Sequence, residues 1–370
     1  MADHRPTVVV LSHWPWDTHF WQFNKQVGLR LAELGHQVLW VDDRLRMRRD
    51  GFVSWMRGFP FGRVTTAEKM RRLQPWSVSG LRLGERNPVP SAVTAAQIRR
   101  YLRRLRLAGE VVLVYSPDEN AIARRLEPSQ LVFWTGDDTT LPNEDWLVDR
   151  ADTILALSAP TYAEMAQRAP GRTFRVPTGV PFDMFVEAAD EKTCPPEMVG
   201  LPRPIFGFAG NITADRIDFA IVRELANSFP HGTVAFVGPC EQATLDWFPP
   251  NVVFIAEQPY AEIPRFMAQF DVGIAPYLHT RFNERSSPLK VHEYFAVGLP
   301  VVGTGLSALT EYEELAVIAE TPAEFAVAAG DAARTRHDPD LIDRRRGAAA
   351  VNGVDRIAET VSSLISRLAH

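Results

Sequence analysis

The sequence predicts an α/β protein with two doubly wound, Rossmann-like domains that face a cleft, and three observations lead to this class. Short apolar stretches alternate with helical patterns along most of the 370 residues, as is typical of parallel sheets joined by crossover helices. The series stops at a proline-rich stretch and then starts again. The length also fits two domains of roughly 100 to 200 residues each.

The expected strands are short and mostly apolar. In the first domain they lie at residues 7–11, 37–41, 111–115, 131–135, 153–157 and 173–176. In the second domain they lie at residues 205–209, 233–237, 252–255, 272–275 and 300–303. Between the two series, residues 190–204 carry four prolines and predict a linker.

We therefore expect a first domain over residues 1–185, a linker over 186–204 and a second domain over 205–350. Residues 351–370 hold apolar side chains at helical spacing, which predicts an amphipathic helix that packs on another surface. Doubly wound sheets bind ligands at the carboxyl ends of their strands, so a site is expected in the loops that follow the strands.

The composition excludes several classes of protein. With 46% hydrophobic and 23% charged residues, the chain has too much apolar material to be disordered. No apolar run approaches the roughly 18 residues that span a bilayer. The two cysteines, Cys194 and Cys240, and the polar first residues argue against a disulfide-stapled secreted protein. We expect a cytoplasmic protein whose membrane contact, if any, is peripheral to the inner face.

Positive charge is concentrated in one segment of a chain whose net charge is -5. Between Arg44 and Arg106 there are fifteen arginines and one lysine against three acidic residues, which gives +13 there and leaves -18 elsewhere. Such a segment attracts an anionic acceptor or a lipid surface. No motif that reads nucleic acid accompanies it, so nucleic acid is not an expected partner. A solvated basic helix face is the plainer alternative.

The loop after the first strand contains several aromatic residues and no glycine. It runs Ser-His-Trp-Pro-Trp-Asp-Thr-His-Phe-Trp over residues 12–21. A dinucleotide-binding fold needs G-x-G-x-x-G at this place, so a nicotinamide or flavin enzyme is disfavoured. The aromatic side chains could stack against a sugar, or half of them could belong to the core.

The most informative stretch, residues 285–304, predicts a loop, a helix, a turn and a strand. Ser287 is a suitable N-cap and Pro288 fits the first helical position. Gly298 and Pro300 are expected to end the helix.

Two side chains of this helix predict a ligand. Lys290 stands where a capping box would place Glu or Gln, at the positive end of the helix dipole. The placement is favourable when an anion lies over the exposed amides, because a helix N-terminus with a lysine binds phosphate. Glu293, about one turn further, can accept hydrogen bonds from ribose hydroxyls. The pair predicts a nucleotide-sugar site; a solvated surface ion pair is the alternative.

Residues 287–302, Ser-Pro-Leu-Lys-Val-His-Glu-Tyr-Phe-Ala-Val-Gly-Leu-Pro-Val-Val, resemble the donor-binding signature of GT-B glycosyltransferases, in particular the family 4 branch (glycosyl transferases group 1). Less specific likeness extends over residues 14–17, 31–38, 176–180, 206–212 and 271–277. The resemblance implies an N-terminal acceptor domain, a C-terminal nucleotide-sugar domain, and a C-terminal helix that packs back toward the N-terminal domain.

The resemblance also assigns site residues. Lys290 would anchor the donor diphosphate and Glu293 would accept from the ribose. Further donor contacts are implied for Gly210, Arg216, Arg285, Ser286 and Ser287. Residues 255–258 would meet a pyrimidine base through backbone groups. On the acceptor side, the first loop offers His13, Trp14, Trp16 and Asp17.

One departure from the family pattern affects the sugar contact. Retaining members carry E-x7-E, and the first glutamate of that motif falls on Arg285 here, with Glu284 one place out of register. An arginine there suits a carboxylated sugar or clamps phosphate. The choice between retention and inversion stays open on this ground.

A second resemblance concerns catalysis. Residues 131–138, 153–158 and 286–301 are similar to the corresponding stretches of the bacterial xanthan glucuronosyltransferase, an inverting GT-B enzyme whose catalytic base falls on Asp137 here. Such a base takes the proton of the attacking acceptor hydroxyl, and Asp138 is the neighbouring candidate. The same residues also form a good turn sequence.

We therefore expect a metal-independent glycosyltransferase that needs no cofactor and uses a UDP- or dTDP-linked sugar as donor. The acceptor would be saccharide, lipid-linked or a small molecule, in polysaccharide or glycoconjugate biosynthesis. Histidine and cysteine are scattered, so no metal site is predicted. A nucleotide-sugar epimerase of the same fold and a non-catalytic nucleotide-sugar-binding subunit are the alternatives.

Overall fold

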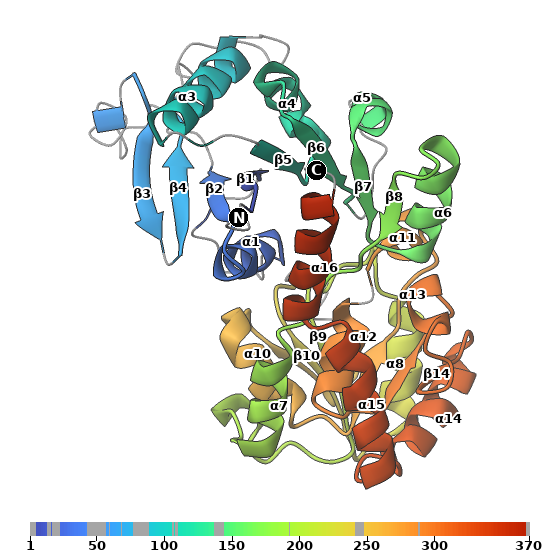
Figure 1. Cartoon of the computed structure of the whole chain (residues 1–370). Coiled ribbons are helices and arrows are strands. Elements are labelled where there is room, and N and C mark those ends of the chain that lie inside the picture. The colour runs from blue at the N-terminus through green and yellow to red at the C-terminus, as the bar shows by residue number, and fades with distance from the viewer. Residues whose placement is uncertain are drawn as a thin grey trace.

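The structure is a computed structural model. It describes residues 5–12, 16, 23–42, 57–58, 60–67, 69–76, 89–105, 107, 110–136, 144–191, 193–240, 248–287 and 289–367. Two sheets, each flanked by helices, form an N-terminal and a C-terminal lobe (Figure 1). This arrangement confirms the predicted fold class.

The N-terminal lobe contains an eight-stranded sheet in the order β3-β4-β2-β1-β5-β6-β7-β8. Its strands are β1 (Thr7–Leu11), β2 (Gln37–Val41), β3 (Arg63–Ala67), β4 (Met70–Gln74), β5 (Glu110–Val114), β6 (Gln130–Trp134), β7 (Thr153–Ala156) and β8 (Thr173–Arg175). Neighbouring strands run parallel except β3 and β4, which are antiparallel. The hairpin β3–β4 was not among the predicted strands.

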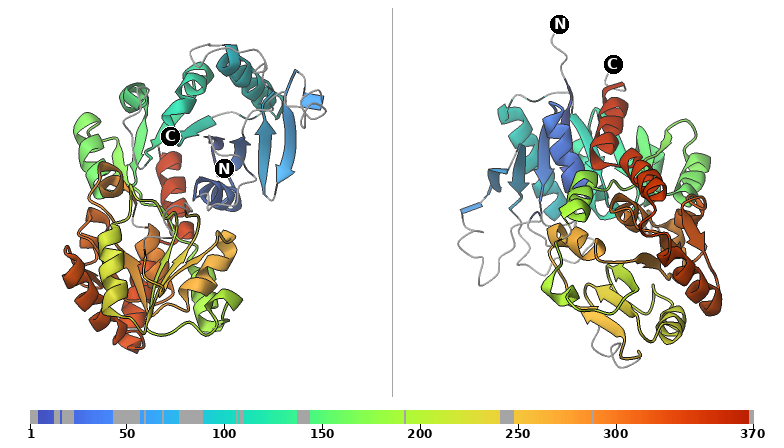
Figure 2. Two further views of the ribbon diagram at one scale, coloured as in Figure 1. Left: turned by 180° about the vertical axis from the view of Figure 1, so that it is seen from behind. Right: turned by 90° about the horizontal axis from the view of Figure 1, so that it is seen from below.

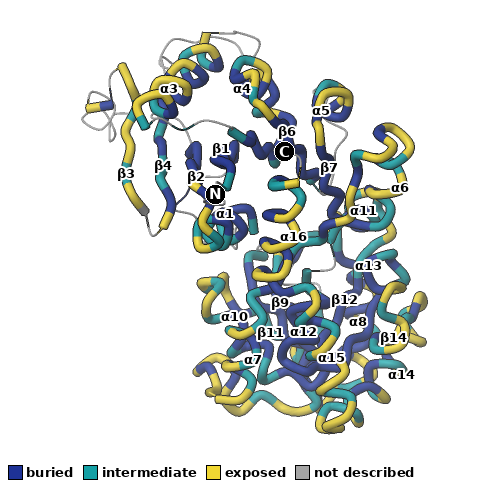
Figure 3. Tube along the Cα trace, in the orientation of Figure 1, coloured by how far each residue is buried: buried dark blue, intermediate teal, exposed yellow. Residues whose placement is uncertain are grey.

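Helices cover both faces of this sheet, which explains why its central strands are apolar throughout. Val9 of β1 packs in a cluster with α3 (Val89–Leu105) and α4 (Asn120–Leu126). Val8 and Val10 face the other way, toward α1 (Phe23–Glu33). The lobe is completed by α5 (Glu144–Arg150) and α6 (Ala159–Arg168). Figure 3 shows the central strands buried, and the edge strand β3 and the outer helix surfaces largely exposed.

The C-terminal lobe contains a six-stranded sheet in the order β11-β10-β9-β12-β13-β14, parallel throughout. Its strands are β9 (Ile205–Ala209), β10 (Thr233–Val237), β11 (Val252–Ile255), β12 (Val272–Ala275), β13 (Val301–Gly303) and β14 (Ala316–Ile318). The short edge strand β14 was not predicted. The helices are α7 (Phe182–Glu191), α8 (Phe219–Ser228), α10 (Ile263–Met267), α11 (Arg281–Arg285), α12 (Leu289–Ala296), α13 (Ser307–Thr310), α14 (Pro322–Ala333) and α15 (Pro339–Val351).

The segment expected to be a linker is partly helical. Residues 186–191 belong to α7, and Met198 further along is 3% exposed in the core of the C-terminal lobe. The connection is therefore packed onto this lobe over much of its length.

The last helix, α16 (Val354–Arg367), packs against the N-terminal lobe as predicted. Its apolar residues Ile357, Val361 and Ile365 are buried in the cluster that also holds Val27 of α1. Arg30 of α1 and Asp355 form an ion pair, with 2.6 Å between Nε and Oδ1. Figure 2 shows from two further sides that the C-terminal end of the chain lies beside the N-terminal lobe.

Candidate functional site

A cavity of about 240 Å³ lies in the C-terminal lobe at the carboxyl ends of three neighbouring strands. It is lined by residues 209–211 at the end of β9, by residues 237–239 at the end of β10, and by Glu257, Gln258 and Tyr260 after β11. The first turns of α12 complete the wall with Leu289, Lys290 and Glu293. This is where doubly wound sheets bind ligands, and it includes Glu257 and Gln258 of the segment expected to meet a base.

Two glycines let the β9 and β10 loops approach each other at the cavity. Gly210 and Gly238 have φ angles of +155° and +143°. A Cβ atom on Gly238 would lie 2.2 Å from the carbonyl oxygen of Gly210. Gly210 therefore lies at the cavity, where the sequence places it, and Gly238 is an additional residue of the same kind.

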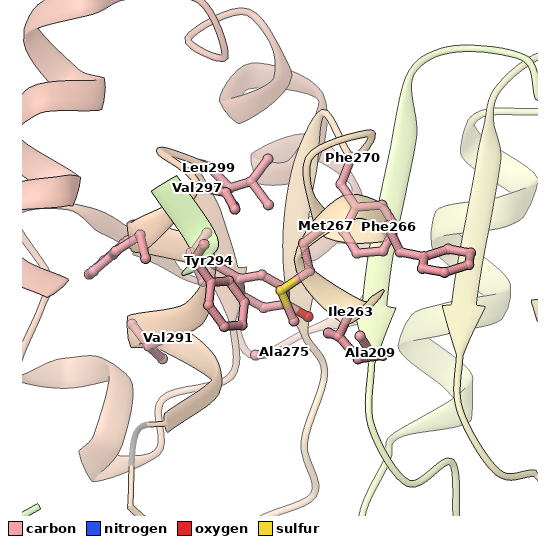
Figure 4. Close-up of a cluster of buried hydrophobic side chains, with 14 of the residues drawn as sticks. Ala209, Ile263, Phe266, Met267, Phe270, Ala275, Val291, Tyr294, Val297 and Leu299 are labelled. Carbon is pink, nitrogen blue, oxygen red and sulfur yellow. The ribbon is translucent and has the colours of Figure 1, made fainter. Parts of the chain in front are cut away.

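Helix α12 is fixed on the sheet by a buried tyrosine. The hydroxyl of Tyr294 lies 3.2 Å from the carbonyl oxygens of Gly207 on β9 and Ile274 on β12, to which it donates. Its ring lies in the apolar cluster with Met267 of α10 (Figure 4). The helix ends before Gly298, whose φ is +79°, as predicted. This anchoring sets the positions of Lys290 and Glu293 at the cavity.

Glu293 has a fully buried side chain with a partner on each carboxylate oxygen. The ammonium group of Lys290 lies 2.8 Å from Oε2, and the hydroxyl of Tyr260 donates to Oε1 at 2.6 Å. Burial and the neighbouring charge of Glu293 raise the pKa of Tyr260 well above its usual range, so this hydroxyl stays protonated. A buried carboxylate needs such compensation. The solvated surface pair considered as an alternative is therefore excluded.

A second cavity, of about 90 Å³, adjoins the first at Lys290, which lines both. Arg216, Ser286 and Ser287 also line this smaller cavity. The guanidinium of Arg216 lies 4.1 Å from the ring centroid of Phe282, which orients it by a cation–π contact. The rest of the lining is mostly apolar, so the two cations, Arg216 and Lys290, are the groups that favour a phosphate there.

The two predicted serines line the smaller cavity, and their hydroxyls also form hydrogen bonds within the protein. The hydroxyl of Ser286 donates to the carbonyl of Phe282 at 2.9 Å. The hydroxyl of Ser287 accepts from the backbone N–H of Thr178 at 2.9 Å, a contact between the signature and the segment that joins the lobes. Pro288 lies outside the described residues.

Arg285 lies in neither cavity. Its guanidinium forms an ion pair with Glu164 of α6 in the N-terminal lobe, and its side chain is 7% exposed. The neighbouring Glu284 accepts from His279 at 2.9 Å and from the backbone N–H of Ser307 at 3.3 Å. The structure therefore places Arg285 in an interlobe contact rather than in the predicted donor set, because the acidic partner from α6 meets it there.

On the acceptor side, the structure describes one of the predicted residues. Trp16 is 6% exposed and packs edge-on against Trp40, with 5.5 Å between ring centroids. Lys25 lies 4.1 Å above the Trp16 ring. Trp16 is therefore part of the core of the N-terminal lobe, which leaves it little surface to offer a sugar and corrects its assignment to the acceptor site.

Five predicted residues lie outside the described residues: His13, Trp14, Asp17, Asp137 and Asp138. The last described residue before the two aspartates is Gly136, which follows β6. Within the described parts of the chain, no three His, Cys, Asp or Glu side chains are grouped so that they could hold a metal ion.

Among the cavity residues that were not assigned a role from the sequence are Asn211, Gly238 and Tyr260. The available signal was their position, since each follows a predicted strand of the C-terminal domain. Nothing in the sequence pairs Tyr260 with Glu293, because 33 residues separate them.

Comparisons with known proteins agree with this fold. Residues 203–334 match the family model described as glycosyl transferases group 1, which confirms the resemblance of the signature. Over these residues the chain is similar to the group 1 glycosyl transferases, and its two-lobed fold is that of GT-B glycosyltransferases.

One curated relative is TuaH of Bacillus subtilis (strain 168), named provisionally as a teichuronic acid biosynthesis glycosyltransferase. It is 29% identical over 178 residues, which cover 45% of this chain and 44% of TuaH. The match thus spans less than half of either protein.

Solved structures share the fold over nearly the whole chain. Sucrose-phosphate synthase from Thermosynechococcus elongatus has a TM-score of 0.72 at 14% identity and covers 99% of both chains. Anabaena HepE in complex with UDP and glucose has a TM-score of 0.62 at 13% identity, with 98% of this chain and 100% of HepE covered. At this identity, the likeness establishes the fold alone.

Proposed function

We propose that this protein is a glycosyltransferase that moves a sugar from a UDP- or dTDP-linked donor to a hydroxyl of an acceptor, without a metal ion or other cofactor. The observation that carries the proposal is the pair of adjoining cavities that share Lys290. The smaller cavity has two cations for a diphosphate, and the larger has the buried carboxylate of Glu293 for a ribose. UDP is a suitable first probe, since HepE was solved with UDP.

The chemistry follows from where charge develops. As the bond between sugar and diphosphate breaks, negative charge grows on the leaving phosphate, and Lys290 with Arg216 would stabilise it. In an inverting displacement, a carboxylate takes the proton of the acceptor hydroxyl as its oxygen attacks the anomeric carbon. We propose Asp137 for this role, with Asp138 as the neighbouring candidate.

Nucleotide release with and without acceptor tests the proposal. The purified protein is incubated with a panel of UDP- and dTDP-linked sugars, alone and with saccharide and lipid-linked acceptors. Release of nucleotide that depends on acceptor supports transfer. Interconversion of the donor sugar without acceptor would assign the site to an epimerase instead. Binding of a nucleotide sugar without any turnover would assign it to a binding subunit.

We also propose that the acceptor or its carrier is anionic, in polysaccharide or glycoconjugate biosynthesis. Four exposed arginines lie on α3, a helix without acidic residues: Arg99, Arg100, Arg103 and Arg104. Arg100 lies 3.9 Å from the ring centroid of Phe61, which is 51% exposed. Basic side chains around an exposed aromatic ring fit the headgroup region of an anionic membrane. TuaH, by its name, acts in the biosynthesis of an acidic polymer.

Cosedimentation with liposomes tests this surface. None of the helices that the structure describes is long and apolar enough to cross a bilayer. We propose a cytoplasmic protein with a peripheral membrane contact. Vesicles containing phosphatidylglycerol should carry the protein down at low salt, and Arg103→Gln with Arg104→Gln should weaken this. If wild-type protein stays in the supernatant, an anionic soluble acceptor becomes the better occupant of the basic surface.

A further inference from the structure

Tyr260 lines the larger cavity, and its hydroxyl touches the proposed ribose-binding carboxylate. We infer that Tyr260 is a positioning residue, which holds Glu293 in the orientation that accepts the ribose hydroxyls of the donor. The inference rests on the proposed function, because it requires a nucleotide in the larger cavity.

The hydrogen bond between Tyr260 and Glu293 can stay in place when a nucleotide binds. Tyr260 opens the short helix Tyr260–Glu262, directly after the β11 loop, and its hydroxyl reaches Oε1 of Glu293 across 2.6 Å. An ionised carboxylate has about four acceptor positions on two oxygens. One hydrogen bond from Tyr260 and one from Lys290 therefore leave positions for ribose hydroxyls.

The other partner of Glu293 has a second task. Lys290 lines both cavities, so its ammonium group lies between the carboxylate and the place proposed for the diphosphate. A bound diphosphate attracts the ammonium group and weakens its hold on Glu293. The side chain of Glu293 is 0% exposed. If its carboxylate rotated, its contact with the ribose would be lost. Tyr260 then keeps the carboxylate in place.

Tyr260 is itself held by packing. Its ring lies 6.1 Å from the ring of Phe185 on α7, measured between centroids. The hydroxyl donates without adding charge, so Glu293 keeps the negative charge that makes it a strong acceptor. The raised pKa of Tyr260 means that this donor persists at every physiological pH.

A ratio of affinities tests the inference, because a purely structural role would not change it. UDP and dTDP are titrated into the wild-type protein by calorimetry. The nucleotide that binds more tightly is then compared with its analogue whose sugar ring lacks the hydroxyl groups. Because the hydroxyls would form hydrogen bonds to a charged group, we expect the analogue to bind at least about tenfold more weakly than the parent nucleotide. Tyr260→Phe keeps the ring on Phe185 and should reduce this ratio about threefold or more, chiefly through weaker binding of the parent nucleotide.

Tyr162→Phe, at a 39% exposed tyrosine on α6, is the matched control and should leave the ratio unchanged. Equal weakening of both nucleotides by Tyr260→Phe would show that the hydroxyl only supports the fold, and so would overturn the inference. The inference is also overturned if the wild-type protein binds the nucleotide but does not distinguish it from the analogue. Failure of the wild-type protein to bind either nucleotide instead contradicts the proposed function.

Discussion

Arg285 at the end of α11 and Glu164 of α6 form an ion pair that joins the two lobes. The arginine is nearly buried, whereas Glu164 is 38% exposed. A second interlobe pair links Arg175 of β8 to Glu311, which follows α13. The residue that replaces the first glutamate of the E-x7-E pattern thus takes part in the packing of one lobe on the other.

The first prediction concerns the effect of reversing the charges at this pair. Arg285→Glu restores the glutamate of the family pattern but places it against Glu164, and we expect a loss of about 1–3 kcal/mol in the free energy of unfolding. Adding Glu164→Arg should recover at least half of the loss, as measured by urea denaturation. Glu359→Gln, at an exposed glutamate of α16, is the control. Strictly additive effects of the two reversals would show that the residues do not interact.

A second prediction concerns acid and His292. This residue of α12 is 0% exposed, its Nε2 lies 2.7 Å from the hydroxyl of Tyr312, and burial lowers its pKa to about 3. The unfolded chain therefore binds a proton between about pH 6.5 and 3 that the folded chain does not. Stability from this group is full above pH 6.5 and is lost toward pH 3, by up to about 1.4 kcal/mol per pH unit.

The comparison with His292→Gln isolates this contribution. The free energy of unfolding of both proteins is measured from pH 7 to pH 4. The advantage of the wild-type protein should shrink as the pH falls, since glutamine does not ionise. Parallel curves for the two proteins would contradict the assignment.

The third prediction has the opposite sign and concerns His279. Its two ring nitrogens lie 2.9 Å from Glu284 and 3.0 Å from Glu320. These hydrogen bonds, with Glu284 first, raise the pKa of His279. Its contribution is therefore full below about pH 6.5 and is lost as the pH rises through the raised value. Melting temperatures from pH 6 to 9 should fall less steeply for His279→Gln than for the wild-type protein, and His231→Gln, at an exposed histidine, should follow the wild type.

The fourth prediction tests the proposed base. Asp137→Asn keeps the shape of the side chain but removes its ability to take a proton, so turnover should fall about a hundredfold or more while the donor binds nearly as before. Initial rates and donor titrations on the same folded protein check both parts. Near-normal turnover would move the role to Asp138 or favour a mechanism without an enzymic base.

The sequence predicts those parts of the site that depend on local spacing. Lys290 and Glu293 are three residues apart on a helix, and helical geometry alone brings their side chains together. The buried strands around them are apolar on both faces and are recognisable for that reason. The structure confirms the ion pair between Lys290 and Glu293 and the strands around it. These features are predictable because short-range geometry determines them.

Other features depend on contacts between distant segments. The β3–β4 hairpin contains Arg63, Arg71 and Arg72 and lies at the edge of its sheet, where charged side chains are tolerated and no apolar alternation forms. Trp16 could face a ligand or the core, and the partner that decides, Trp40, lies on another strand. The contact of Glu164 with Arg285 spans 121 residues, so no spacing rule predicts it.

The central claim is that Lys290 binds the diphosphate of a nucleotide, and calorimetric titration of UDP and dTDP into wild-type protein and Lys290→Ala tests it most directly. Removal of a charge-assisted contact should weaken binding of the preferred nucleotide about tenfold or more. Lys69→Ala, at a lysine on the β3–β4 turn whose partner is Glu33, should bind as the wild type does. Normal nucleotide binding by a folded Lys290→Ala protein would contradict the claim and place the nucleotide site elsewhere.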